Sequence, residues 1–552
     1  MARRVHDIND YFMPRRFGKA MMVMHAFGTG TASDQAVTVA SATARSGFSG
    51  IWYQWMWLFA TPFYWLIAPI MRRFRAVTTA DVYALRYDSS VSVLFAIVGI
   101  AGMSVKIGLM LKGAGALIDA STGGLIESDW AIPLMTLLFV VYGMAGGLGG
   151  AIVTDFVQGL MTILFSVMLL PVILCEVGGL SGMRSTIVAA HLHRDMLSLV
   201  APAEIGVFYI VMLSLNTLFL IVAMPSVMGN CAAGRTEMDG RVGFMVGTLV
   251  KRSCTIAWCL TAMAAVAWYL QQGIDLHTID PDKVYGDVAH RFLPQLLPGM
   301  LGVFIASLLA AIMSSCDSFM IASSALFTKN IYQRLARGQS PRHYVWVGRF
   351  ASLAVVAGGI VFAYYVEGVV PALKIWYKVV PMMGIAFWLG LLWRRATVAG
   401  AWASTIAGFA AWWLVTRSWC VAWAAGLPGA EKLGLVVHES GTRTVVYEPW
   451  QIAFYLTAGL LAGVLVSLLT KPVDKARLDN FYNLVRTPVQ PGEKSGEPCM
   501  LPEGVEPTRR RMLATSLGLE IPAPSRTSVM GLLAGWLAVF LLIGGFVLLI
   551  EV

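Results

Sequence analysis

Small, mostly hydroxylated side chains form a stripe within one long apolar segment, residues 298–333. The stripe consists of Ser307, Ala311, Ser314, Ser315 and Ser318. These positions are three or four residues apart, so they share one face of a helix. Hydroxyl and carbonyl oxygens are the ligands that hard cations prefer, and small side chains let a neighbouring backbone approach. The stripe therefore indicates either a Na⁺ site or close packing of two helices.

Two carboxylates also lie within apolar segments, where a charge is costly and usually functional. Asp155 follows the glycine-rich run 143–150, and Asp317 lies inside the serine stripe. We expect both to bind a cation or a proton, although an aspartate at position 155 also suits the start of a helix. Four lysines share this apolar setting: Lys106, Lys112, Lys251 and Lys378. Each either contacts a solute or extends its amine toward the membrane surface.

Patterns typical of an enzyme are missing from the sequence. The eight histidines form no HExxH pattern, and no G-x-x-x-x-G-K-[ST] loop for ATP is present. The seven cysteines include no CxxC pair and are interpreted as small apolar packing residues, not as disulfides or metal ligands. We therefore predict no catalytic residues and no bound organic cofactor.

The elements that position these residues must cross a membrane. Of the 552 residues, 57% are hydrophobic and 13% are charged, and soluble domains carry about a quarter charged residues. Apolar runs reach the roughly 20 residues that a bilayer requires, and we predict an all-α integral membrane protein with about 13 transmembrane helices. The predicted helices are 20–44, 48–72, 89–118, 130–146, 149–176, 204–230, 242–272, 298–333, 343–366, 370–394, 396–418, 450–470 and 529–550.

Two of the predicted helices contain residues that interrupt a regular helix. The first includes Gly28, Thr29, Gly30 and Thr31, and the sixth includes Pro225. Interruptions five helices apart are what an inverted five-plus-five helix repeat produces, with helices 1 and 6 discontinuous around a ligand. The alternative for each break alone is a packing face or a proline kink.

Charge placement predicts the orientation of the chain. If the helices alternate, most Lys and Arg residues fall on the side of the N-terminus, which is typical of the cytoplasmic side. The net charge of +10 is then a consequence of topology, and we expect no nucleic-acid partner. We predict a multi-pass protein of the plasma (inner) membrane with the N-terminus inside and the C-terminus outside. No cleavable signal peptide is visible.

The predicted domains follow from the helix positions. They are a cytoplasmic segment 1–19, a ten-helix transporter core 20–394, additional membrane helices 395–470, a cytoplasmic linker 471–528 and a last membrane helix 529–552. The linker contains several prolines and the run Arg509-Arg510-Arg511.

Three segments resemble the sodium:solute symporter family, which includes sodium/galactose and sodium/proline symporters. They are Tyr142-Gly143-Met144-Ala145-Gly146-Gly147-Leu148 with Thr154-Asp155-Phe156-Val157-Gln158, Ala310-Ala311-Ile312-Met313-Ser314-Ser315-Cys316-Asp317-Ser318, and Gly390-Leu391-Leu392-Trp393-Arg394-Arg395. The resemblance implies a LeuT-like fold that works by alternating access. Family members usually have a further helix before the first core helix, and none precedes residue 20 here.

The resemblance also implies the ion ligands. The family's main sodium site uses two carbonyls of helix 1 with an alanine carbonyl and two hydroxyls of helix 8, which correspond to Gly28, Thr31, Ala311, Ser314 and Ser315. Some members have a second sodium site, which would here involve Asp155, Ser314 and Ser318. Asp317 stands where that second site has a serine, so it would strengthen cation binding or bind a proton instead.

Substrate residues carry over less completely from the family. In sugar-transporting members, polar pairs after the helix-1 break and residues of helices 2, 7 and 10 contact the solute. The corresponding or neighbouring positions here are Asp34, Gln35, Gln54, Lys251, Trp376, Tyr377 and Lys378. The sugar-contacting amides of helices 6 and 10 correspond to Ala223 and to a position near Leu373. The solute is therefore predicted to be a sugar or polyol, or an organic anion paired with Lys378.

Together these features predict a sodium-coupled secondary active symporter that imports a small polar organic solute. Its partners are the solute, Na⁺ as the co-transported ion and the lipid bilayer, with no obligate protein partner. One alternative is a proton-coupled symporter on the same scaffold, with Asp155 and Asp317 as proton carriers. Another is a membrane sensor that binds solute without transporting it.

Overall fold

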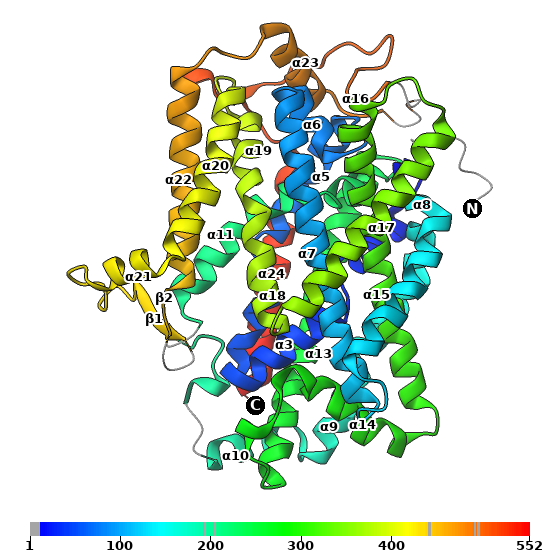
Figure 1. Cartoon of the computed structure of the whole chain (residues 1–552), viewed down its shortest axis with the longest axis vertical. Coiled ribbons are helices and arrows are strands. Elements are labelled where there is room, and N and C mark those ends of the chain that lie inside the picture. Colours follow the sequence, from blue (N-terminus) through cyan, green and yellow to red (C-terminus); the bar gives the residue numbers. More distant parts are fainter. Residues whose placement is uncertain are drawn as a thin grey trace.

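The computed structural model describes residues 12–190, 194–201, 205–439, 443–490, 493 and 497–551 of the chain. Long helices lie side by side along the longest axis of the molecule, and short helices and loops cover its two ends (Figure 1). One end holds α6 (Thr79–Arg86) and α23 (Lys475–Arg486), and we call it the α23 end. The other end holds α10 (Gly179–Ala189) and α14 (Val284–Leu296), and we call it the α14 end.

The remaining elements follow in chain order. Up to the middle of the chain they are α2 (Lys19–Gly28), α3 (Ser33–Ser46), η2 (Gly47–Ile51), α4 (Trp52–Trp55), α5 (Thr61–Arg73), α7 (Ser89–Ser121), α8 (Ser128–Val167), α9 (Leu170–Glu176), η3 (Arg194–Leu197), α11 (Val207–Ala223), α12 (Val227–Ala232) and α13 (Glu237–Gln271). Beyond it they are η4 (Leu276–Thr278), η5 (Pro281–Lys283), α15 (Met300–Ala325), η6 (Leu326–Tyr332), α16 (Gln333–Leu335), α17 (Pro341–Tyr365), α18 (Val369–Val379), α19 (Pro381–Leu392), α20 (Val398–Val415), α21 (Ser418–Ala425), α22 (Glu448–Leu469), η7 (Ser516–Gly518) and α24 (Arg526–Glu551).

Strands contribute little to the architecture of the described residues. The antiparallel pair β1 (Val436–Glu439) and β2 (Arg443–Val446) forms a small hairpin beside α21, and β3 (Met512–Ala514) pairs with β4 (Ile521–Pro522). The all-α class predicted from the sequence is therefore confirmed. Among the described residues, nine helices are long and apolar enough to cross a membrane, and two shorter apolar helices accompany them.

The predicted count of about 13 transmembrane helices is not confirmed. The main reason is that the first two predicted spans consist of short pieces. Residues 20–44 divide into α2 and α3, and residues 48–72 divide into η2, α4 and α5. Each piece is shorter than the roughly 20 residues that cross a bilayer in one regular helix.

Helix α8 covers the span that we predicted at 130–146 and most of the one predicted at 149–176, which continues into α9. Near its start, Ile132 approaches Gly115, and the nearby Ala120 of α7 approaches Gly286 of α14. Near its end, Phe165 packs against Tyr285 of the same α14. Both ends of α8 therefore lie at the α14 end, so we infer that the helical chain reverses direction within α8, as two separate spans require.

The first predicted interruption is present between α2 and α3. Gly30 has φ +80°, a left-handed conformation that glycine adopts without strain. Side chains donate hydrogen bonds to four consecutive backbone carbonyls there: Thr31 to Phe27, Ser315 to Gly28, Lys251 to Thr29 and Gln35 to Gly30. Irregular backbone at membrane depth persists only when its polar groups are satisfied in this way.

The second predicted interruption separates α11 from α12. Met224 has an extended backbone with ψ 124°, and Pro225 follows it without an N–H to continue the helix. The hydroxyl of Ser226 and the amide oxygen of Asn230 are buried and have no hydrogen-bond partner among the described residues. The interruption therefore presents free polar atoms to its surroundings.

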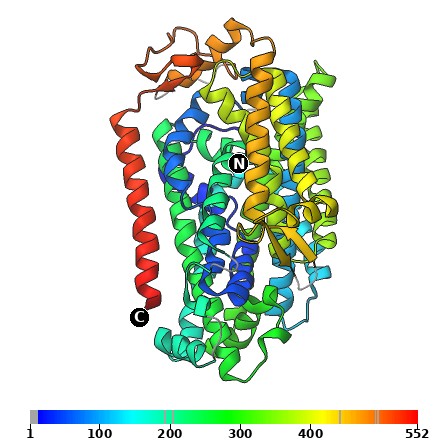
Figure 2. The ribbon, with the colours of Figure 1, turned by 90° about the vertical axis from the view of Figure 1, so that its left-hand side faces the viewer.

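The predicted linker 471–528 contains α23 and packs against the neighbouring ends of the membrane helices. Phe481 and Tyr482 of α23 are buried, and Arg394 at the end of α19 pairs with Asp479 at 2.5 Å and with Glu520 at 2.6 Å. The last helix, α24, then runs along the outside of the bundle (Figure 2). It packs mainly against α5, where Gly531 lies directly over the indole ring of Trp65.

Candidate functional site

The serine stripe of α15 lies against the interruption between α2 and α3. The Ser315 hydroxyl donates a 2.8 Å hydrogen bond to the Gly28 carbonyl and accepts one of 3.0 Å from the Gly30 N–H. Gly28 also permits the close approach of the two helices, because a Cβ there would fall on the Ser314 hydroxyl. The lack of a side chain at position 28 thus brings a backbone carbonyl next to two serine hydroxyls.

The other two residues predicted for the main sodium site lie nearby in the chain. Thr31 is inside the interruption and is fully buried, and Ala311 lies one turn before Ser314 and Ser315 on α15 and is also fully buried. The contacts of the described residues bring the Gly28 carbonyl and the hydroxyls of Ser314 and Ser315 together between the two helices. Such oxygens suit a hard cation.

Asp155 of α8 lies at the same contact. Its Oδ1 accepts a 2.6 Å hydrogen bond from the Ser314 hydroxyl, and its Oδ2 lies 2.6 Å from Nδ1 of His25. An ionised Asp155 carboxylate only accepts hydrogen bonds, and with it His25 Nδ1 carries the hydrogen of this contact. Both carboxylate oxygens of Asp155 are therefore bound to protein donors.

His25 is a residue that the sequence reasoning missed. It lies on α2, four residues before Thr29, and is only 1% exposed. The available signal was a histidine in an apolar segment just before the glycine and threonine run, which is itself a functional indication in a membrane helix.

The remaining residues of the predicted second cation site are less closely gathered. The Ser318 hydroxyl accepts a 3.3 Å hydrogen bond from Thr29 rather than contacting Asp155. Asp317 faces Gly143 of α8, and its Oδ1 has no hydrogen-bond partner among the described residues. The contacts of the described residues thus join Asp155 to Ser314 but do not join either to Ser318 or Asp317.

An ion pair lies just beyond the interruption. Lys106 of α7 binds Asp34 of α3 with a distance of 2.7 Å between Nζ and Oδ2, and both side chains are buried. The Lys106 amine also lies 4.8 Å from the centre of the Trp376 ring. The carboxylate that we predicted to contact solute is therefore paired with a lysine, although its Oδ1 has no partner among the described residues.

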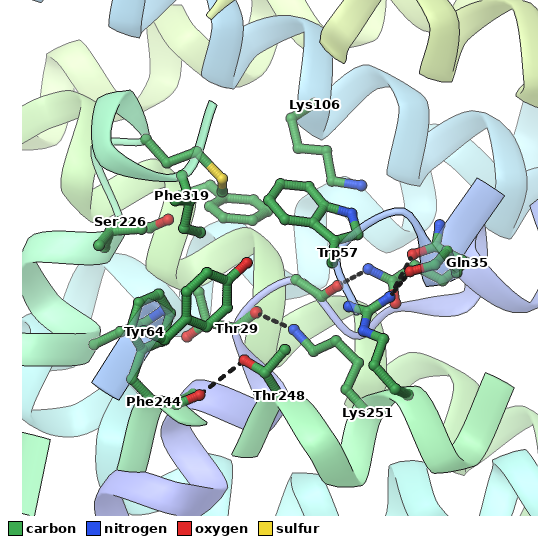
Figure 3. A pocket seen from close by; sticks show the side chains of 18 of the residues that line it. Thr29, Gln35, Trp57, Tyr64, Lys106, Ser226, Phe244, Thr248, Lys251 and Phe319 are labelled. Carbon is green, nitrogen blue, oxygen red and sulfur yellow. Dashed lines mark hydrogen bonds between the residues drawn. The ribbon is translucent and has the colours of Figure 1, made fainter. Parts of the chain in front are cut away.

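A cavity opens between the two interruptions (Figure 3). Of the predicted substrate residues, four line it: Gln35, Gln54, Lys251 and Trp376. The lining also includes Lys106, for which solute contact was one of two alternatives, and Tyr64, Arg252 and Asn230, which we had not predicted to contact solute. These residues come from α3, α4, α5 and α7 in the first part of the core and from α12, α13 and α18 in its second part. The cavity therefore lies between helices from both parts.

Tyr377 and Lys378 lie outside the lining of this cavity, so their contact with solute stays a prediction. Lys378 forms an ion pair of 2.8 Å with Glu448 of α22, and Tyr377 lies beside Tyr209, with 3.4 Å between the hydroxyl oxygens. Neither residue is among the described residues that line the cavity. The pairing was hidden in the sequence because Glu448 lies 70 residues after Lys378, outside the predicted core.

The interruption between α2 and α3 connects the contact of Gly28 with the α15 serines to the cavity. Gly30 donates its N–H to Ser315 on one side and lines the cavity on the other. Thr29 also lines the cavity, and its carbonyl accepts the 2.8 Å hydrogen bond from Lys251. A ligand at either site therefore acts on the same few residues of backbone.

The chain is similar to several known transporters. The profile of the Sodium:solute symporter family matches residues 11–408. The sodium/pantothenate symporter of Haemophilus influenzae is 24% identical over 412 residues, which cover 69% of this chain and 80% of that protein. The osmoregulated proline transporter OpuE of Bacillus subtilis is 24% identical over 499 residues, or 86% of this chain and 92% of that protein.

A solved structure shows the same fold. A Na⁺-coupled sialic acid symporter superposes with a TM-score of 0.67 at 18% sequence identity, covering 86% of this chain and 95% of the other. The likeness agrees with the inverted repeat that we predicted from the paired interruptions.

Proposed function

Because this chain belongs to the sodium:solute symporter family, we propose that it couples Na⁺ entry to the import of a small polar organic solute by alternating access. Its Na⁺ ligands are the Gly28 and Thr31 carbonyls, the Ala311 carbonyl and the Ser314 and Ser315 hydroxyls. The observation that carries the proposal is the hydrogen bond from Ser315 to the Gly28 carbonyl, which brings two of these oxygens within 2.8 Å. The relatives found by comparison are transporters and not enzymes.

The coupling follows from the shared backbone of the interruption. Na⁺ bound between α15 and the end of α2 would hold residues 28–31 in the conformation that also forms one wall of the cavity. A solute that binds the same conformation is then bound more tightly when Na⁺ is present, and Na⁺ is bound more tightly when the solute is present. We place the α23 end on the cytoplasmic side, because most Lys and Arg residues are predicted to fall in loops on that side.

Thermal unfolding of the purified protein tests the cation site. The midpoint is measured in NaCl and in choline chloride at matched ionic strength and pH, because a ligand that binds only the folded state raises the midpoint. We expect a rise that is specific to sodium and absent in Ser314→Ala. Ser324→Ala is the matched control, since Ser324 is buried on the same helix and donates to the Ile321 carbonyl.

Uptake into proteoliposomes then tests transport. We expect solute accumulation to require an inward sodium gradient. Accumulation that follows a proton gradient without sodium would replace this proposal with the proton-coupled alternative, and sodium-dependent binding without uptake would indicate a sensor.

A further inference from the structure

The cavity between the interruptions has an excess of positive charge. Of the described residues that line it, Lys106, Lys251 and Arg252 carry cationic groups, and none is an aspartate or glutamate. Lys106 is neutralised by Asp34. Lys251 and Arg252 form no ion pair with a carboxylate among the described residues, so two basic side chains at the cavity are left without an acidic partner.

Both of these cations are deeply buried. Lys251 is 6% exposed and Arg252 is 3% exposed, on the helix α13 that crosses the middle of the bundle. Lys251 donates to the neutral carbonyl of Thr29, and Arg252 donates to the side-chain oxygen of Gln54 at 3.2 Å. A buried charge without an opposite charge is costly, which favours an anionic ligand as the missing partner.

Free donors accompany the two charges. Nε of Arg252 is buried and has no hydrogen-bond partner among the described residues, and the same is true of the Tyr64 hydroxyl. A guanidinium with a free Nε–H suits the planar carboxylate group, which it can bind through two parallel hydrogen bonds. The hydroxyl of Ser226 is a further unpartnered group at the cavity.

The opposite side of the cavity is aromatic. Figure 3 shows the rings of Tyr64, Phe244 and Phe319 on one side, and Lys106, Lys251 and Gln35 on the other. Tyr64 and Phe244 stack with 4.3 Å between their ring centres. Trp376 and its neighbour Trp57 also line the cavity beside Lys106. Aromatic rings therefore border the cavity on both sides, which favours a flat or apolar group in the ligand.

We infer that the transported solute is an organic carboxylate with an apolar body, and that Lys251 and Arg252 bind its carboxylate. This inference rests on the proposed function and narrows its substrate class from a polar solute to an anion. The sequence alone assigned the anion to Lys378, which Glu448 neutralises away from the cavity.

Matched pairs of probes test the charge directly. Acetate, hexanoate, benzoate and phenylacetate are each compared with the corresponding neutral amide, and myo-inositol serves as a neutral polyol. The change in the unfolding midpoint is titrated in NaCl. We expect at least one carboxylate to bind at about a tenfold or more lower concentration than its amide, because hydrogen bonds to charged groups are the stronger ones.

Variants assign the preference to residues. Lys251→Met and Arg252→Gln should abolish the preference for carboxylate over amide, whereas Lys251→Arg should retain much of it. Lys112→Met is the matched control, because Lys112 is a half-buried lysine of α7 that does not line the cavity. The midpoint in NaCl without solute shows whether each variant is folded.

The outcomes separate this inference from the proposed function. A sodium-specific rise with no carboxylate preferred over its amide, or with binding of myo-inositol alone, would overturn the inference and leave the symporter intact. A carboxylate effect of equal size in choline chloride would support the anion site but contradict sodium coupling. Retention of the preference in both Lys251→Met and Arg252→Gln would overturn the residue assignment.

Discussion

The hydroxyl of Ser315 on α15 is joined to the carbonyl of Gly28 at the end of α2 by a hydrogen bond of 2.8 Å. The two residues are 287 positions apart in the chain, so this contact fixes the interruption of the first core helix against a distant helix. A cation placed between them would bind both oxygens and strengthen the same contact.

Replacing Ser315 with alanine should weaken sodium binding while the protein still folds. The variant loses a ligand oxygen and leaves the Gly28 carbonyl without its side-chain donor. Loss of one interaction with a charged ligand is worth about 1.5–3 kcal/mol, or at least about tenfold in affinity. The sodium concentration that gives half of the rise in unfolding midpoint should increase by that factor. Equal sodium dependence in Ser315→Ala and in Ser324→Ala would contradict the site.

Adding one methyl group at Gly28 should block the approach of α2 to α15. A Cβ at this position falls on the Ser314 hydroxyl, which Asp155 already holds. We expect Gly28→Ala to cost about 1–3 kcal/mol of folding free energy through overpacking and to abolish the sodium-dependent rise in midpoint. Gly302→Ala is the control on α15, because a Cβ there meets no atom within 4 Å. A sodium response of wild-type size in Gly28→Ala would show that the contact is not part of the cation site.

Removing one partner of the Asp34–Lys106 pair should destabilise the fold more than removing both. Lys106→Met leaves a buried carboxylate without its cation, which typically costs about 3–5 kcal/mol. The double variant Asp34→Asn with Lys106→Met should recover much of that loss. Thermal unfolding of the wild type, of each single variant and of the double variant measures the coupling between the two side chains. Additive losses in the double variant would mean that the two side chains do not stabilise each other.

Arg394→Ala should loosen the segment that covers the α23 end. Arg394 binds both Asp479 of α23 and Glu520 near β4, so its loss releases two contacts at once. Limited proteolysis should cut the region between α22 and α24 faster, while the sodium-dependent rise in midpoint stays unchanged. Arg509→Ala is the control, since Arg509 is exposed. Identical cleavage rates in the two variants would argue against a role for Arg394 in holding this segment.

The sequence predicted best what depends on local composition. The interruption near Gly30 was visible because glycine and threonine replace helix-forming residues there, and the serine stripe was visible because helical spacing places its members on one face. Both features involve residues that are close in the chain. The α class and the paired interruptions follow from the same local information.

Contacts between residues far apart in the chain could not be predicted from the sequence. Lys378 looked available for a solute because nothing near it in the chain carries a negative charge, and its partner Glu448 belongs to a later helix. Likewise, His25 becomes meaningful only when α8 brings Asp155 to it across 130 residues. The predicted linker also gave no sign of packing, because the buried Phe481 and Tyr482 of α23 stand among charged and polar residues.

The packing of α24 against α5 has a consequence for how the protein is made. Trp65 donates a 2.9 Å hydrogen bond from its indole N–H to the carbonyl of Thr527, which lies 462 residues later in the chain. At about 5–20 residues per second, a ribosome needs roughly 20–90 seconds to synthesise that interval. Throughout that time the surface of α5 around Trp65 lacks its final partner. The nascent chain thus completes this face of the bundle only when its last helix enters the membrane.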